Sequence, residues 1–137
     1  MTFMNRVGTS QNMYQGKTKR VLCVCSAGIL RSPTSAHILS AEPFNFNTRA
    51  AGASEEFALI PLDKVLIGWA DVIICMEDEH LLKVTKLMDE MTSDTAHIEV
   101  YNVHCPDLYS YRDPDLVRYL TDTFTQIFNK ETHVHTE

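Results

Sequence analysis

Residues 20–33 read Arg-Val-Leu-Cys-Val-Cys-Ser-Ala-Gly-Ile-Leu-Arg-Ser-Pro. The apolar run that ends at Cys25 predicts a buried strand, and a segment compatible with a helix opens at Arg31. Pro33 suits the first turn of such a helix, because the N–H groups there have no intrahelical partner. The stretch therefore predicts a strand, a tight loop and a helix N-terminus in succession.

This junction favours the binding of an anion. The N–H groups of a short loop and of a first helical turn point at one spot, and the helix dipole adds positive potential there. Arg31 lies at the rim, where its planar guanidinium can hold two oxygens of an anion at once. Gly28 permits a positive φ where the chain curls. We predict that Arg31 binds an oxyanion together with Ser26, Ala27, Gly28, Ile29, Leu30 and Ser32.

Cys25 occupies the base of the predicted anion site. A thiol beside an arginine and a helix N-terminus is readily available as a thiolate nucleophile. Ser32 can donate its hydroxyl to that thiolate. The alternative is a buried structural cysteine with an arginine on the surface.

The rest of the chain alternates expected strands with expected helices. This order predicts a parallel sheet covered on both faces, with right-handed crossovers and ligands at the carboxyl ends of the strands. The fold class is therefore α/β, with a four-stranded parallel sheet in a single domain. Apolar patterning places the strands at 20–25, 44–51, 70–76 and 97–103, and the helices at 32–41, 55–69, 78–91 and 114–129.

The length of 137 residues fits one domain. We expect it to span residues 18–130. Residues 1–17 lack periodicity and are expected to be a flexible extension. Residues 131–137 are expected to be a polar tail.

Charge and hydropathy limit which partners and which cellular compartment we expect for the protein. Eighteen acidic residues against twelve basic ones give a net charge of −6, which argues against nucleic acid as a partner. No apolar stretch is long enough for a membrane span, and the first residues lack the apolar core of a signal peptide. We therefore expect a cytoplasmic protein without a membrane partner.

The cysteines and histidines do not suggest disulfides or a metal. Cys23, Cys25 and Cys75 lie in apolar, strand-like runs of a chain that is expected in the cytoplasm, so reduced thiols are predicted, Cys105 included. A core position is expected for Cys23. The histidines show no spacing typical of metal ligands. We predict no metal and no organic cofactor.

A second group of polar residues, Tyr-Ser-Tyr-Arg-Asp-Pro-Asp at 109–115, follows the fourth expected strand and opens the last helix. The departure of an alkoxide or phenolate from phosphorus is helped by a positioned acid, and Asp113 before Pro114 is well placed to supply a proton. Two alternatives remain open. Asp113 can simply cap the helix, and Asp107 is a competing acid.

Taken together, Cys25, the five residues after it, Arg31, Ser32 and the later Asp113-Pro114 resemble the motifs of the low-molecular-weight protein tyrosine phosphatase family. The resemblance covers about residues 20–129. It implies a phosphatase I-like fold and a metal-free hydrolase of phosphorylated proteins or small phosphomonoesters, most specifically a protein tyrosine phosphatase. It also implies a phosphocysteine intermediate on Cys25, with Arg31 binding the phosphoryl group and Asp113 as general acid.

The chain departs from the family pattern at four positions. Gly28 stands where the phosphate loop of the family usually has Asn, and Ala50 replaces the Ser that buttresses that Asn. Leu30 takes the place of a second loop cysteine in many members. Asp115 replaces the Tyr after Asp-Pro, so the aromatic wall around a phosphotyrosine ring is expected from Tyr109 or Tyr111.

Three other functions are compatible with parts of this pattern. Arsenate reductases share the fold and the loop, but they need further cysteines in a mobile segment. A phosphocysteine carrier domain of a sugar-transport system has a cysteine after its first strand, but there Arg31 and the Asp-Pro loop lack a purpose. A catalytically weak phosphoprotein-binding module is the alternative outside enzymes, and turnover of an aryl phosphate distinguishes it from a phosphatase.

Overall fold

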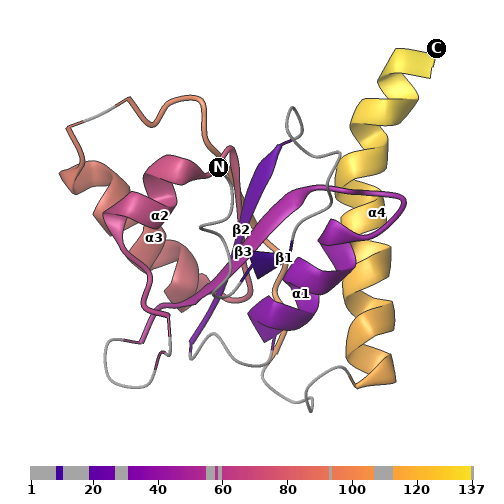
Figure 1. The fold of residues 1–137 in the computed structure, drawn as a ribbon, viewed down its shortest axis with the longest axis horizontal. Helices are drawn as coiled ribbons and strands as arrows, with labels where there is room; N and C mark the ends of the chain where they lie inside the picture. Colours follow the sequence, from indigo (N-terminus) through magenta and orange to yellow (C-terminus); the bar gives the residue numbers. More distant parts are fainter. Residues whose placement is uncertain are drawn as a thin grey trace.

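The computed structural model describes residues 9–10, 19–26, 31–54, 58, 60–92, 94–106 and 113–136, with backbone only at 9–10 and 129–136. Strands and helices alternate over most of this range, as predicted (Figure 1). The strands are β1 (Thr9–Ser10), β2 (Arg20–Cys25), β3 (Asn47–Gly52), β4 (Val72–Cys75) and β5 (Glu99–Asn102). The helices are α1 (Arg31–Ser40), α2 (Lys64–Trp69), α3 (Asp78–Glu90) and α4 (Pro114–Thr136).

The sheet has the strand order β1-β3-β2-β4-β5. β3, β2, β4 and β5 pair in parallel, which confirms the predicted four-stranded parallel sheet. β1 adds a short antiparallel edge, with Thr9 opposite Arg49. Thr9 and Ser10 belong to the expected N-terminal extension, and the other residues of that extension lie outside the described part of the chain. A strand of two residues is too short to produce a periodic pattern in the sequence.

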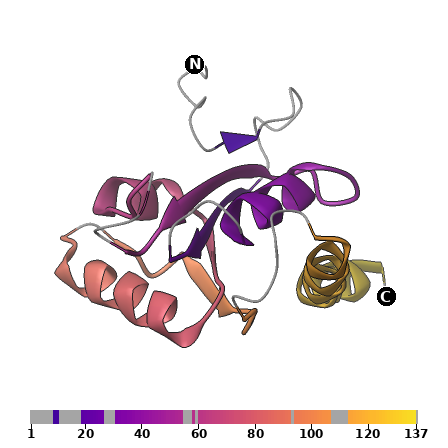
Figure 2. The ribbon, with the colours of Figure 1, turned by 90° about the horizontal axis from the view of Figure 1, so that it is seen from below.

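The two faces of the sheet bury two separate sets of side chains. Because successive residues of a strand point to opposite faces, Cys23 and Cys25 pack with α1 and α4, whereas Leu22 and Val24 pack with α2 and α3. Figures 1 and 2 show the sheet between these two pairs of helices. The apolar runs of the central strands are thus explained by burial on both faces. None of the helices in the described part of the chain is long and apolar enough to cross a membrane.

One strand and two helices differ from the sequence prediction by three residues or more. The strand expected over 44–51 begins only at Asn47, because the N–H groups of Phe44 and Asn45 both donate to the backbone oxygen of Ala41 in a turn. The helix expected over 55–69 begins only at Lys64, because Pro61 lies in an extended bridge to Gly52 and Asp63 caps the helix by accepting a hydrogen bond from the N–H of Leu66 at 2.9 Å. α4 runs to Thr136, past its expected end at residue 129. No Gly or Pro follows that position to break the helix, so most of the expected polar tail is helical.

The strand order has a reversal point beside β2. The chain passes from β2 to β3 on one side and then to β4 on the other side of β2, so the strand order reverses beside β2. Ligands of open α/β sheets bind at such a reversal, outside the carboxyl ends of the strands. Cys25 ends β2 at this edge, Glu77 follows β4, and Cys105 follows β5.

Candidate active site

Cys25 lies at the carboxyl end of β2, and its Sγ is 3.2 Å from the Oγ of Ser32 in α1. The Ser32 hydroxyl also approaches the backbone oxygen of Ala51 on β3, at 3.4 Å. A hydroxyl has one hydrogen. Ser32 can therefore donate to Ala51 while it accepts from the thiol, or turn its hydrogen to the sulfur once the thiol has lost its proton.

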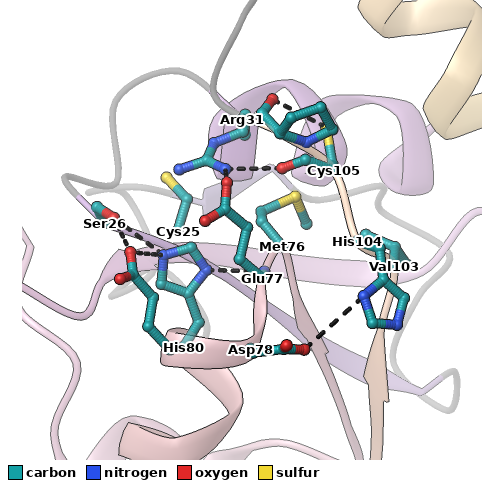
Figure 3. Close-up of polar contacts among 12 residues, drawn as sticks. Cys25, Ser26, Arg31, Met76, Glu77, Asp78, His80, Val103, His104 and Cys105 are labelled. Carbon is teal, nitrogen blue, oxygen red and sulfur yellow. Dashed lines mark hydrogen bonds and ion pairs between the residues drawn. The ribbon is translucent and has the colours of Figure 1, made fainter.

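Arg31 is the first residue of α1, and its side chain is buried, with 2% of the residue exposed. Its Nη1 donates to Oε2 of Glu77 at 2.6 Å and to the backbone oxygen of Cys105 at 2.7 Å (Figure 3). A buried charge is tolerated only where a counter-ion and hydrogen bonds replace the lost water. The residues after β4 and β5 thus hold the guanidinium at the carboxyl edge of the sheet.

Ser26 follows Cys25 and contacts the first turn of α3. Its hydroxyl donates to Oε2 of Glu79 at 3.1 Å and lies 3.0 Å from Nε2 of His80. The N–H of Glu77 donates to Nδ1 of His80 at 3.0 Å. Nδ1 of His80 accepts a hydrogen bond, so the proton of the neutral ring is on Nε2. The single hydrogen of the Ser26 hydroxyl points to Glu79, so the N–H at Nε2 donates a hydrogen bond to the Ser26 oxygen.

Asp113 precedes α4 and caps it. Its Oδ1 accepts a hydrogen bond from the N–H of Asp115 at 2.8 Å, and its backbone oxygen accepts from the N–H of Val117 at 2.9 Å. The described contacts therefore match the capping alternative. A cap through one carboxylate oxygen leaves the second oxygen of the group for proton transfer, so the two roles are compatible. Asp115 pairs with Arg118 at 3.0 Å on the surface of the helix.

The structure brings together four of the predicted site residues at one edge of the sheet. They lie at the two ends of the loop between β2 and α1, with Cys25 and Ser26 before the loop and Arg31 and Ser32 after it. The other predicted residues, apart from Asp113, lie outside the described part of the chain: Ala27, Gly28, Ile29, Leu30, Tyr109, Tyr111 and the competing acid Asp107.

Sequence reasoning missed the partners that come from β4 and α3. Glu77, Glu79 and His80 belong to the polar run Glu-Asp-Glu-His that directly follows an apolar, strand-like segment. The carboxyl ends of parallel strands lie on the same side of a sheet, so the polar residues after β4 were candidates for a place on that side together with those after β2. That placement was the available signal. The backbone oxygen of Cys105, which accepts from Arg31, could not be predicted in this way, because every residue has a backbone oxygen.

All four cysteines are buried, and none of them is in a disulfide in the structure. Burial raises the pKa of the Cys23 thiol above its usual range, and the neighbouring Cys25 and Cys75 raise it further. Burial raises the pKa of Cys75 to about 12. Cys23 lies in the core beside α1 and α4, as predicted. Within the described residues, His, Cys, Asp and Glu form no group of three or more that could hold a metal ion.

Solved structures share the fold of this chain, although no protein-family model and no curated protein matches its sequence. Vibrio vulnificus Wzb in complex with benzylphosphonate is 18% identical, with a TM-score of 0.61 over 82% of this chain and 98% of the other. The low-molecular-weight protein tyrosine phosphatase of Tritrichomonas foetus is 16% identical, with a TM-score of 0.61 over 83% and 96%.

The YwlE arginine phosphatase of Geobacillus stearothermophilus is 17% identical, with a TM-score of 0.59 over 85% of this chain and 97% of the other. All three comparisons cover nearly the whole of the solved chain. This protein therefore has the fold of the low-molecular-weight protein tyrosine phosphatases, and the predicted fold class is confirmed.

Reactivity with an alkylating agent tests the assignment of Cys25. Iodoacetamide at neutral pH should label Cys25 first, because Cys25 lies beside Arg31 and the N-terminus of α1. Cys23 and Cys75 should react slowly, because burial keeps both protonated. Mass-spectrometric mapping over time measures the order, and vanadate should slow the labelling of Cys25. First labelling of Cys75 or Cys105 would contradict the assignment.

Proposed function

We propose that this protein is a phosphomonoester hydrolase that works through a phosphocysteine intermediate on Cys25. The observation that carries the proposal is the Cys25 thiol, hydrogen-bonded to Ser32 and drawn beside the buried guanidinium of Arg31 in Figure 3, at the carboxyl ends of the strands. A nucleophile and a cation at the N-terminus of one helix suit attack on a bound oxyanion.

In the first step the Cys25 thiolate attacks phosphorus, and the bond from phosphorus to the leaving oxygen breaks. The hydroxyl of Ser32 donates to the thiolate before the attack. Arg31 holds two phosphoryl oxygens in its planar fork. Asp113, in its protonated form, gives its proton to the leaving oxygen.

In the second step water hydrolyses the phosphocysteine. The Asp113 carboxylate takes one proton from the attacking water, a phosphorus–oxygen bond forms, and the phosphorus–sulfur bond breaks. The Cys25 thiolate and inorganic phosphate are released. Asp113 ends the cycle protonated, as it began, so protons and electrons balance without a metal or a redox partner.

The most specific substrate in this proposal is a phosphotyrosine protein, with Tyr109 or Tyr111 as the aromatic wall for the ring. The fold is shared by enzymes described as tyrosine phosphatases and as arginine phosphatases. Cysteines that form no disulfide are typical of cytoplasmic proteins, so we propose a cytoplasmic phosphoprotein as the substrate.

Arsenate reduction has less support, because Cys75 packs on the face of the sheet opposite to Cys25. A thiol relay between these two residues would have to pass through the sheet.

Substitution of the nucleophile and of the arginine tests the mechanism. Cys25→Ser should abolish turnover of para-nitrophenyl phosphate while vanadate still binds. Arg31→Lys should lose on the order of a hundredfold or more in kcat/KM, because a lysine keeps the charge but not the planar fork. Full activity of Cys25→Ser would refute the mechanism. Oxyanion binding without turnover by the unmodified protein would instead support the phosphoprotein-binding module.

Leaving-group dependence tests the role of Asp113. Asp113→Asn should lower kcat for phenyl phosphate on the order of a hundredfold or more, because phenolate leaves poorly without a proton. Para-nitrophenyl phosphate has a better leaving group and should lose less. Asn also caps helices well, so the variant should keep its stability.

Asp107→Asn is the control for this experiment, since Asp107 has no following Pro and helix to fix its position. A leaving-group-dependent loss in Asp107→Asn, with none in Asp113→Asn, would make Asp107 the acid and Asp113 only a cap.

A panel of phosphorylated peptides tests the substrate. Peptides of one sequence that carry phosphotyrosine, phosphoserine or phosphoarginine at the same position are compared by kcat/KM. Phosphotyrosine should be hydrolysed fastest, because its aromatic ring buries the largest apolar area against an aromatic wall. Replacement of Tyr109 and Tyr111 by Ala should reduce this preference. A higher kcat/KM for phosphoarginine would overturn the tyrosine assignment but not the phosphocysteine mechanism.

A further inference from the structure

We propose that Glu77 and His80, in the turn that opens α3, are positioning residues that hold the two ends of the loop between β2 and α1. The proposal rests on the function proposed above and adds residues outside that loop to its site. Neither residue is expected to touch the substrate. Each acts through a loop residue, Glu77 through Arg31 and His80 through Ser26.

The contact of Glu77 fixes the orientation of the arginine. Nη1 of Arg31 has two acceptors, the carboxylate of Glu77 at 2.6 Å and the backbone oxygen of Cys105 at 2.7 Å. Two bonds at one corner of a planar group restrict its rotation. A negative charge placed anywhere around Arg31 would offset its positive charge, but the two acceptors at Nη1 also fix the direction in which the guanidinium points. Figure 3 shows the guanidinium between the Cys25 sulfur and the Glu77 carboxylate.

The contact of His80 fixes the other end of the loop. His80 is 1% exposed, so its ring has one packed orientation. Nδ1 accepts from the N–H of Glu77, and Nε2 faces the Ser26 hydroxyl at 3.0 Å, with Oε2 of Glu79 farther away at 3.5 Å. Ser26 is the residue that follows the nucleophile. Its backbone oxygen accepts from the N–H of Ser54 at 2.9 Å, so Ser26 is held through both its backbone and its side chain.

The two contacts belong to one rigid element. The N–H groups of His80 and Leu81 both donate to the backbone oxygen of Glu77, at 3.1 and 3.2 Å. Only Met76 separates Glu77 from the end of β4 at Cys75. The hydrogen bond from the Glu77 N–H to His80 joins the two positioning side chains. The end of β4 and the first turn of α3 thus set the distance between the side chains that contact Arg31 and Ser26.

Matched substitutions at Glu77 separate positioning from charge. Glu77→Gln and Glu77→Met both remove the negative charge, but only Gln keeps an oxygen that can accept from Arg31. Glu77→Gln should keep kcat for para-nitrophenyl phosphate within about threefold of the unmodified protein, whereas Glu77→Met should lose about tenfold to a hundredfold. Asp78→Asn is the control for charge, because Asp78 is 82% exposed and contacts Asn102 and His104. It should leave kcat unchanged.

Matched substitutions at His80 separate the contact with Ser26 from the helix cap. Asn places an acceptor near Nδ1 for the Glu77 N–H but no donor near Ser26, and Gln places a donor near Nε2 but no acceptor at Nδ1. His80→Asn should lose about tenfold in kcat, whereas His80→Gln should keep kcat. Both variants should lose some stability, because each leaves space where the buried ring packs, so the difference in kcat between them carries the test.

Alkylation of Cys25 gives a readout that needs no turnover. Iodoacetate is an anion that a correctly placed Arg31 attracts, and iodoacetamide is neutral, so the ratio of the two rates reports the placement of the guanidinium. The ratio should fall in Glu77→Met relative to Glu77→Gln, and in His80→Asn relative to His80→Gln. It should stay unchanged in Asp78→Asn. If the protein hydrolysed no phosphomonoester, the proposed function would fail while this ratio still tested the positioning.

Equal ratios and equal kcat values within each matched pair would overturn the proposal and leave Glu77 as a counter-ion only. If Glu77→Met did not fold, His80→Asn and His80→Gln would carry the same test. The nitrogen chemical shifts of His80 provide a spectroscopic check, because the proposal requires the proton on Nε2 and none on Nδ1. A proton on Nδ1 at neutral pH would exclude the hydrogen bond from Glu77.

Discussion

The burial of the Arg31 guanidinium is the constraint on which the site depends. A charge that is 2% exposed has lost its water and needs protein acceptors in fixed places. Glu77 provides one from the end of β4, and the backbone of Cys105 provides another from the segment after β5. The loop after β2 is therefore tied to two neighbouring strands. The sheet order that makes those strands neighbours is thus also what allows Arg31 to be buried.

The sequence predicted the parts of this arrangement that depend on local pattern. The apolar run before Cys25 and the spacing to Arg31 are features of one short segment, so the strand, the helix and their shared end could be predicted from it. The pairing of Arg31 with Glu77 spans 46 positions and depends on which strands are neighbours. No local pattern contains that information. The late start of α2 and the long α4 were missed for a simpler reason, because caps and the lack of a breaker outweigh apolar periodicity.

The support of the loop differs from what the resemblance implies. In the family a Ser on the strand at Ala50 buttresses the loop, whereas Ala50 is buried on β3 opposite Cys23 and carries only a methyl group. β3 therefore offers no side-chain hydrogen bond at this position. The segment after β3 holds the loop ends only through its backbone, with the N–H groups of Ala53 and Ser54 donating to the backbone oxygens of Cys25 and Ser26. The side-chain contacts from Glu77 and His80 come from the start of α3. Loss of a polar buttress on one strand is thus accompanied by polar contacts from the element on the other side of β2.

The partnership of Arg31 with Glu77 also bears on why an arginine is needed. A carboxylate 2.6 Å from Nη1 offsets much of the positive charge that an incoming phosphoryl group meets. Water reaches Glu77, whose side chain is 34% exposed, and screens part of this opposing field but not all of it. Net charge alone is therefore a weak source of affinity here. What the guanidinium adds is direction, since its planar fork keeps N–H donors in fixed geometry while one corner is bound to Glu77. A lysine in this place would be neutralised by Glu77 and would have no second edge to present.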